Sequence, residues 1–221
     1  MEILFEDSWL LAINKPAGLS TESGLAPDRS ADTEALQYLL QRDTATPGWI
    51  PPKKVHYLRA VHRLDRAASG VLLLAKSKPV LSNLMTQFER QSVEKVYVAE
   101  VESLPPGGNG FLRHFLKKTP DGKSALAFDR EVPDSRPAEL RYYVMENTQK
   151  GIRLEIFPAG GRFHQIRAQL AHIGSPIVGD VRYGGSFWRE HAIKLHARRL
   201  CVRHPKSGER LVLEAPLPGD W

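Results

Sequence analysis

The chain has 221 residues, of which 42% are hydrophobic and 25% charged, a composition typical of a globular protein with a substantial core. It contains no apolar run of about 18 residues that would span a membrane, and its first residues lack the features of a signal peptide. The lone cysteine, Cys201, excludes an internal disulfide and favours a reducing, cytoplasmic location. The formal net charge of +6 favours a polyanionic partner.

The first part of the chain predicts a strand hairpin, two helices and one deeply buried strand. Short apolar runs at 3–5 and 9–13 flank an Asp-Ser turn and predict the hairpin. A helix is expected over 32–42. Five consecutive apolar residues at 71–75 predict a strand buried on both faces. Apolar residues at helical spacing predict a core-facing helix over 77–88.

The second part of the chain is rich in predicted strands. The segments with strand character are 93–101, 111–116, 126–132, 140–145, 152–157, 196–202 and 210–213. A helix is expected over 162–173. The hairpin-like spacing of the strands favours a largely antiparallel sheet. We therefore predict an α+β fold, a mixed and mainly antiparallel sheet flanked by helices and loops.

The segment 60–70 concentrates charge where the chain enters its core. It places a histidine, two arginines and Asp65 within five residues, directly before the buried strand at 71–75. A carboxylate at such a position is either paired or used in chemistry, because an unpaired buried charge costs several kcal/mol. Two interpretations remain open from the residues alone: Asp65 neutralises Arg63 or Arg66, or caps a turn, or it takes part in a reaction.

Two further side chains stand out beside this carboxylate. On the helix predicted over 162–173, Arg167 lies about 40° from Phe163, at the margin of the apolar stripe. A guanidinium so near a buried face needs a partner, and a carboxylate offers bidentate geometry. Tyr97 lies on the strand predicted over 93–101. Each residue alone more often has a structural role, an ion pair in the case of Arg167 and a half-buried core tyrosine in the case of Tyr97.

The pattern of these segments resembles the RluA-type pseudouridine synthases. That family carries His-Arg-Leu-Asp, two variable residues, Thr-Ser-Gly and an apolar strand, which segment 61–70 and the strand after it match. Segments similar to other family blocks follow in the family's order at 14–19, 95–99, 161–167, 176–180, 183–184, 195–197 and 204–205. The resemblance implies one pseudouridine synthase catalytic domain over 1–221, without the separate N-terminal RNA-binding module that some relatives carry.

The chain departs from the family pattern at a few positions. Ala68 and Phe163 stand where the family usually has threonine, and Gln169 and His172 replace the commoner residues after the helical arginine. None of these changes removes the aspartate, tyrosine or arginine. They bear on the shape of the pocket and on the choice of target site.

The resemblance implies roles for three catalytic residues, Asp65, Tyr97 and Arg167. Asp65 is the implied nucleophile, and the sequence does not decide whether it attacks ribose C1′, attacks the uracil ring or assists elimination. Arg167 is expected to hold Asp65 ionised and aimed. Tyr97 is expected to stack on the base and to take the C5 proton. The reaction needs no cofactor and no metal.

The resemblance also implies structured RNA, ribosomal or transfer RNA, as the partner. The target uridine would flip out of its stack, and Arg63 is similar to the family residue thought to fill the gap. The Pro-rich basic segment 43–57 is expected to be a surface loop able to contact phosphates. The full set of expected RNA contacts is Lys15, Lys53, Lys54, His62, Arg63, Arg162, His164 and Gln165.

Other functional classes fit less well. The His-Arg-Leu-Asp segment resembles a kinase catalytic loop, but the downstream asparagine, the Gly-rich phosphate loop and Asp-Phe-Gly are missing. The eight histidines form no His-Glu-x-x-His or Cys/His set, so no metal site is expected. A non-catalytic RNA-binding protein on the same fold remains the second hypothesis. A monomer is expected because no unused apolar stripe stands out.

Overall fold

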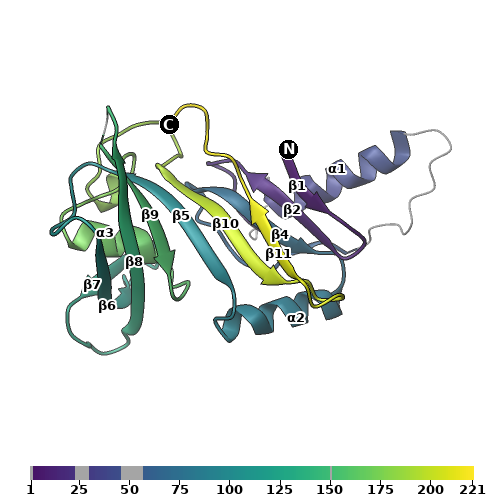
Figure 1. Ribbon diagram of the computed structural model, residues 1–221, viewed down its shortest axis with the longest axis horizontal. Helices are drawn as coiled ribbons and strands as arrows, with labels where there is room; N and C mark the ends of the chain where they lie inside the picture. Colours follow the sequence, from purple (N-terminus) through teal and green to yellow (C-terminus); the bar gives the residue numbers. More distant parts are fainter. Residues whose placement is uncertain (1, 23–29, 46–56, 150) are drawn as a thin grey trace. The chain divides into compact units, whose positions relative to one another are not determined.

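The computed structural model describes residues 2–22, 30–45, 57–149 and 151–221, with the backbone alone for 42–45. The described chain divides into two compact units (Figure 1). Unit 1 comprises residues 1–94 and 197–218, and unit 2 comprises residues 95–196 and 219–221. The chain therefore leaves unit 1, builds unit 2 and returns. The single domain expected over 1–221 stays a prediction.

Unit 1 is a sheet of short strands with two helices. In chain order its elements are β1 (Glu2–Glu6), β2 (Leu10–Lys15), α1 (Ala31–Ala45), β3 (Arg59–Ala60), β4 (Ser69–Ala75), α2 (Lys78–Glu89), β10 (Leu195–Arg203) and β11 (Arg210–Glu214). The strand order is β1-β2-β4-β10, with β11 paired to β10 and β3 paired to β4. The unit division falls near the start of β10.

The core of unit 1 forms around β4, whose seven residues are all buried. An unbroken apolar run suits this position because both faces of the strand are covered. On α2, Val80 and Leu84 recur at helical spacing and pack into a cluster with Leu73 of β4 and Leu200 of β10. Pro79 in the first turn fits the start of α2, where its missing N–H is not needed.

Gly70 allows β4 to lie unusually close to another backbone. Its φ is +115°, and a Cβ at this position would lie 2.3 Å from the carbonyl oxygen of Ala197 on β10. Only glycine tolerates both the backbone conformation and the contact. Gly70 thus serves the close approach of a neighbouring strand, five residues after Asp65.

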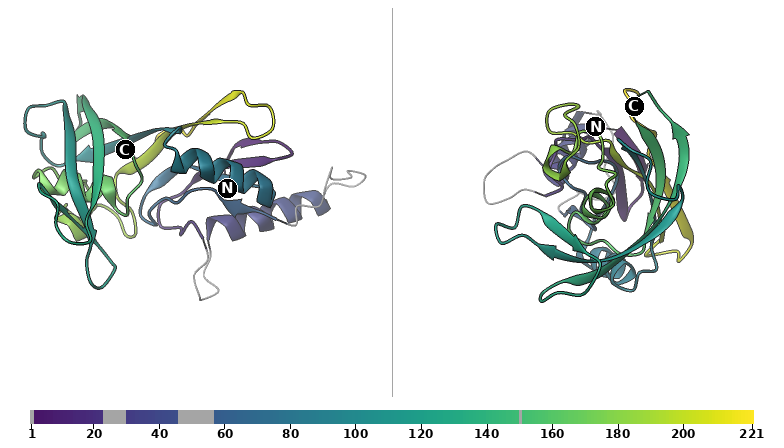
Figure 2. Two further views of the ribbon diagram at one scale, coloured as in Figure 1. Left: turned by 90° about the horizontal axis from the view of Figure 1, so that it is seen from below. Right: turned by 90° about the vertical axis from the view of Figure 1, so that its left-hand side faces the viewer.

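Unit 2 is a curved antiparallel sheet packed against one helix. Its elements are β5 (Glu94–Val101), β6 (Gly110–Lys118), β7 (Ala125–Phe128), β8 (Arg136–Asn147), β9 (Ile152–Pro158), α3 (Gln165–His172) and the 3-10 turn η1 (Val181–Tyr183). The strand order is β5-β9-β8-β6-β7, and each of these neighbouring pairs is antiparallel. Figure 2 shows these strands curving around α3.

The elements confirm the predicted α+β class and most of the predicted segments. The helix expected over 162–173 is wrong at its N-terminal end, because α3 begins only at Gln165. His164 has a positive φ of 51°, which the helix cannot continue through. The two-residue strand β3 was not predicted. No helix among the described residues is long and apolar enough to cross a membrane.

Candidate active site

Asp65 lies on a loop whose backbone is held by a residue far away in the sequence, Thr21. The residue before it, Leu64, has both of its main-chain polar groups bonded to one hydroxyl. Thr21 Oγ1 donates to Leu64 O at 2.9 Å and accepts from Leu64 N at 3.1 Å. Asp65 O accepts from Ala68 N at 3.0 Å and closes a turn. The Asp65 side chain is half-buried, so its position is set by an anchored loop that still leaves it partly accessible.

A buried lysine also holds the same loop. Lys15, the last residue of β2, has no exposed surface. Its Nζ donates to Pro16 O at 2.9 Å, to Leu19 O at 2.8 Å and to Arg66 O at 3.4 Å. Burial lowers the pKa of Lys15 from its ordinary 10.5 to about 7, while the nearby carboxylate of Asp65 acts in the opposite direction. The ammonium therefore anchors the loop through hydrogen bonds and also places a titratable positive charge near Asp65.

The loops at 16–19 and 65–66 are also joined directly. Gly18 N donates to Arg66 O at 2.8 Å, and Arg66 Nε donates to Gly18 O at 2.9 Å. These reciprocal bonds leave Arg66 exposed but place its backbone firmly. Segment 14–19 therefore supports the Asp65 loop.

Tyr97 lies on β5 in unit 2. It pairs across the sheet with Ile156, which pairs in turn with Tyr142, so the three side chains share one face of the sheet. Ile156 and Tyr142 are buried, whereas Tyr97 is half-buried. Two residues earlier, Lys95 Nζ donates to Gly160 O, and burial lowers the pKa of Lys95 to about 8.

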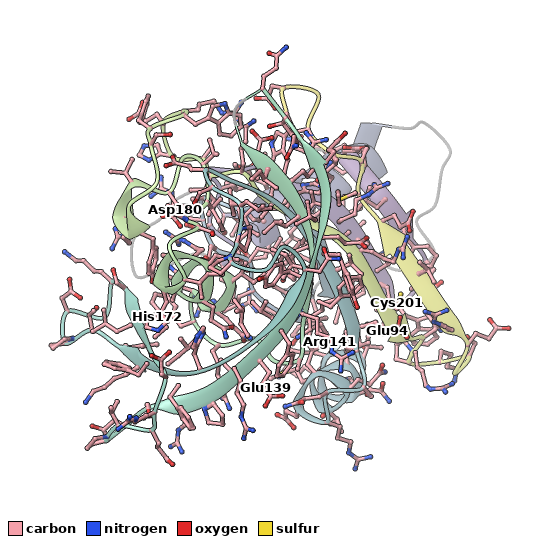
Figure 3. All side chains as sticks on the ribbon, turned by 60° about the vertical axis from the view of Figure 1, so that its left-hand side comes forward. Glu94, Glu139, Arg141, His172, Asp180 and Cys201 are labelled. Atoms are coloured by element: carbon pink, nitrogen blue, oxygen red, sulfur yellow. The ribbon has the colours of Figure 1, made fainter. Side chains whose placement is uncertain are left out.

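Arg167 is held by a carboxylate within unit 2. Its side chain lies on α3 and is 6% exposed. Nε donates to Asp180 Oδ2 at 2.7 Å and Nη2 donates to Asp180 Oδ1 at 2.8 Å, the bidentate geometry that suits a guanidinium. The expected bidentate carboxylate is thus Asp180, just before η1 (Figure 3). The action of Arg167 on Asp65, a residue of unit 1, stays a prediction.

The Arg167–Asp180 pair is built on an ordered turn. Tyr183 N and Gly185 N both donate to the main-chain carbonyl of Asp180 at 2.9 Å. The guanidinium carbon of Arg167 lies 4.9 Å from the centre of the Tyr183 ring. Tyr183 Oη in turn bonds His164 Nδ1 at 3.0 Å and accepts from Ala125 N at 2.7 Å. Arg167 is therefore fixed on two sides, by a carboxylate and by an aromatic ring.

The expected RNA-contacting residues fall into two groups. Arg63 and Arg162 are exposed, and Arg63 lines an open cavity of about 390 Å³ in unit 1. His62 and His164 are half-buried and already engaged. His62 Nε2 accepts from Leu73 N at 3.2 Å, and its ring stacks on a phenylalanine of α2.

Two further residues of this set are buried, and their contact with RNA stays a prediction. Lys15 is buried and its Nζ donates to main-chain carbonyls. Gln165 is 4% exposed, and both ends of its amide bind backbone: Nε2 donates to Glu139 O at 3.0 Å and Oε1 accepts from Arg162 N. Polar residues beside a motif were read as surface groups, whereas both supply internal hydrogen bonds. Lys53 and Lys54 lie outside the described residues.

Thr21 and Asp180 were given no role from the sequence. Asp180 belongs to a segment that resembles the family, which was a usable signal, but its partner lies on another element. Thr21 carries no motif signal at all. The arrangement as a whole offers an anchored carboxylate with a buried cation nearby in unit 1, and a tyrosine and a rigid guanidinium in unit 2.

Comparison with known proteins gives consistent matches. A family model described as RNA pseudouridylate synthase matches residues 9–172. The ribosomal large subunit pseudouridine synthase C of Yersinia pestis is 33% identical, over 97% of this chain and 65% of that protein. YhcT of Bacillus subtilis, an uncharacterized RNA pseudouridine synthase, is 32% identical over 100% of this chain and 70% of its own length. This chain spans slightly less than two thirds of the Yersinia protein.

A solved structure supports the same relationship. The structure of human RNA pseudouridylate synthase domain containing 4 aligns with a TM-score of 0.75 and 25% identity, covering 99% of this chain and 89% of that one. A second human structure, RNA pseudouridylate synthase domain containing 1, has a TM-score of 0.73 at 22% identity and supports the fold.

Proposed function

The chain belongs to the RNA pseudouridylate synthase family, and from that premise we propose that it converts specific uridines in ribosomal RNA to pseudouridine. The observation that carries this proposal is the anchored carboxylate of Asp65. It lies inside the segment matched by the family model, on a loop tied down by Thr21 and Lys15. A nucleophile must be held in one geometry to react, and this loop meets that requirement.

Asp65 opens the reaction in our proposal. Conversion of uridine breaks the bond between ribose C1′ and N1 and rejoins the same ring through C5. A carboxylate nucleophile divides that rearrangement into easier steps, with attack at C1′, attack at the ring and assisted elimination as the three possible first steps. The reaction is an isomerisation without redox change or group donor, so the proposal includes no cofactor.

Tyr97 and Arg167 complete the proposed catalytic set. Arg167 keeps its guanidinium charged at any working pH, and we propose that it acts on Asp65 while Asp180 holds it in place. Tyr97 contributes a ring for stacking and a hydroxyl for removal of the C5 proton. Both residues lie inside the matched segment, as Asp65 does.

The substrate must present its uridine outside the helical stack. Flipping a base costs a few kcal/mol, and we propose that the exposed Arg63 fills the resulting gap. The exposed Arg162 and the net charge of +6 support binding to RNA phosphates. Ribosomal RNA is favoured over transfer RNA because the Yersinia relative is named for the ribosomal large subunit. We place the protein in the cytoplasm, as a monomer.

The test is release of tritium from RNA labelled at uridine C5. Unmodified ribosomal RNA and transfer RNA are incubated separately with wild-type protein, with Asp65→Asn and with a matched control, Asp134→Asn. Asp134 is an exposed aspartate with a φ of 65°, a conformation that asparagine accepts readily. We expect release from ribosomal RNA, loss by several orders of magnitude in Asp65→Asn, and unchanged release in Asp134→Asn.

Other outcomes would reject parts of the proposal. Near-normal turnover by Asp65→Asn would remove the nucleophile assignment. Release from transfer RNA alone would correct the substrate. RNA binding without release from either RNA, equal in wild type and Asp65→Asn, would favour the second candidate, a non-catalytic RNA-binding protein.

A further inference from the structure

Besides the Arg167–Asp180 pair, unit 2 contains a polar cluster formed by His114, Asp129 and His172. His114 lies on β6 and Asp129 directly follows β7. His172, labelled in Figure 3, is the last residue of α3. Phe115 of β6 pairs with Phe128 of β7, so the next step along both chains sets His114 opposite Asp129. The ligand atoms of the three side chains lie within 4.8 Å of one another.

The spacing of these atoms suits a bound cation. His172 Nε2 lies 2.9 Å from Asp129 Oδ1, whereas His114 Nε2 lies 3.8 Å from the same oxygen, beyond a hydrogen bond. Zinc bonds of about 2.0–2.2 Å place the ligand atoms of a tetrahedral site roughly 3.4 Å apart. The two measured distances fall on either side of that value. The remaining pair of ligand atoms, one on each histidine, lies within 4.8 Å, so side-chain shifts of about an ångström would bring all three atoms to one ion.

We propose that His114, Asp129 and His172 form a binding site for a divalent cation of the zinc class. Two imidazole nitrogens and one carboxylate oxygen are ligands that Zn²⁺ accepts in proteins. The Asp129 side chain is 79% exposed, so a fourth position is open to water. The site is separate from the residues proposed for uridine isomerisation and does not depend on that function.

The protonation of the cluster agrees with this assignment. A histidine binds metal through an unprotonated nitrogen. Burial lowers the pKa of His114, the neighbouring His172 lowers it further, and Asp129 acts in the opposite direction. These surroundings favour the neutral ring that metal binding requires. The two rings meet edge to face with centroids 4.7 Å apart, a distance at which two imidazolium charges would repel.

Gln169 lies beside His114 and supplies a hydrogen-bonding group next to the proposed metal ligands. Its side chain is fully buried, with Nε2 3.3 Å from His114 Nδ1 and 3.0 Å from Ala138 O. Its Oε1 is buried without a hydrogen-bond partner among the described residues. A cation on His114 Nε2 moves the ring proton to Nδ1, which then needs an acceptor. Rotation of the Gln169 amide offers Oε1 to that proton, at the loss of the bond to Ala138.

A cation at this position would fasten three elements of unit 2. β6, the chain after β7 and the end of α3 each contribute one ligand. Their spacing along the sequence, at 114, 129 and 172, forms no local motif. Because the ligands come together only in the folded chain, binding of the metal favours the folded state.

The experiment titrates Zn²⁺ into the full-length, tag-free and metal-free protein against a competing chromophoric chelator. The variants are His172→Gln, which removes a partly exposed ligand, and His191→Gln as the matched control. His191 is an exposed histidine of unit 2 that lies 3.4 Å from Glu190, and the described part of the chain offers it no third ligand. Co²⁺ then replaces Zn²⁺ as a spectroscopic probe, because four-coordinate Co²⁺ absorbs strongly in the visible range.

We expect one equivalent of Zn²⁺ in the wild type and in His191→Gln, with a visible Co²⁺ band and a raised thermal midpoint in both. His172→Gln should lose affinity by more than the roughly 10–100-fold that follows loss of an outer-shell partner, and should show neither the band nor the thermal shift. Equal uptake by His172→Gln and wild type, or no stoichiometric uptake by wild type, would overturn the proposal. A Co²⁺–thiolate absorption would assign the metal to Cys201 and overturn it as well.

Discussion

Each unit of the molecule buries a cation within or beside the proposed catalytic set, Arg167 in unit 2 and Lys15 in unit 1, and the two are held differently. In unit 1, Lys15 directs its ammonium at three main-chain carbonyls. In unit 2, Arg167 meets a carboxylate, Asp180, in a bidentate pair. The first arrangement surrounds the charge with neutral dipoles, and the second neutralises it with an opposite charge.

The difference decides how each cation responds to pH. Carbonyl dipoles do not fully offset the loss of water, so burial lowers the pKa of Lys15 to about 7. A guanidinium is not deprotonated in proteins, and its partner is a full negative charge. The lysine anchor is therefore titratable near neutral pH, whereas the arginine anchor is permanently charged. Four predictions test this comparison.

The largest effect is expected from Arg167→Leu, because it leaves the Asp180 carboxylate buried without its partner. Breaking such a pair costs about 3–5 kcal/mol in the free energy of unfolding, measurable by urea denaturation. The control is the double variant Arg167→Leu/Asp180→Asn, which removes the stranded charge and should recover much of the loss. Equal destabilisation of the single and double variants would show that the charge is not the cause.

Lys15→Met should cost less, about 1–3 kcal/mol, because the carbonyls of Pro16, Leu19 and Arg66 lose a donor but no buried, bidentately paired carboxylate is stranded. The matched control is Lys76→Met, a lysine of unit 1 whose Nζ bonds Glu6 and a main-chain carbonyl. Urea denaturation compares the two variants with wild type. A loss in Lys15→Met as large as in Arg167→Leu would contradict the distinction between the anchors.

The Lys15 anchor should also make stability depend on pH. Its pKa is about 7 in the folded chain and 10.5 ordinarily, so between these values the unfolded chain binds more protons. The free energy of unfolding should therefore rise with pH across that window, by at most about 1.4 kcal/mol per pH unit. The penalty of the buried charge is complete below pH 7.

The pH effect is measured as the difference between wild type and Lys15→Met, so that the slope caused by Lys95 cancels. That difference should change with pH between about 7 and 10. The corresponding difference between wild type and Arg167→Leu/Asp180→Asn should stay flat, because the ordinary pKa values of these residue types lie outside that window. A flat Lys15 difference would show that its ammonium keeps its proton throughout.

The smallest effect is expected from Thr21→Val, which removes an uncharged anchor from the Asp65 loop. Leu64 N and Leu64 O both lose the hydroxyl, and a net loss of about 1 kcal/mol is typical of one hydrogen bond. The free energy of unfolding should fall by the same amount at about pH 7 and about pH 9, because the substitution removes no titratable group. Tritium release should fall by more than the loss of folded protein explains, since the loop carries Asp65.

Sequence patterns predicted most of the helices and strands because each of them depends on residues that are close together in the chain. The apolar run at 71–75 and the spacing of Val80 and Leu84 require no knowledge of the partner. The predicted start of α3 was wrong because of the backbone conformation of one residue. His164 is left-handed and its side chain bonds Tyr183, and hydrophobic periodicity does not predict either feature.

The sequence by itself determined the family, the α+β class and the three residues proposed for catalysis, because each is carried by a contiguous motif. Only the tertiary structure decided which groups hold those residues. Asp180 reaches Arg167 across 13 positions, Thr21 reaches Leu64 across 43, and Lys15 reaches Arg66 across 51. A buried polar group must find its partner wherever the fold brings one within hydrogen-bond distance, and that choice depends on packing rather than on neighbours in the chain.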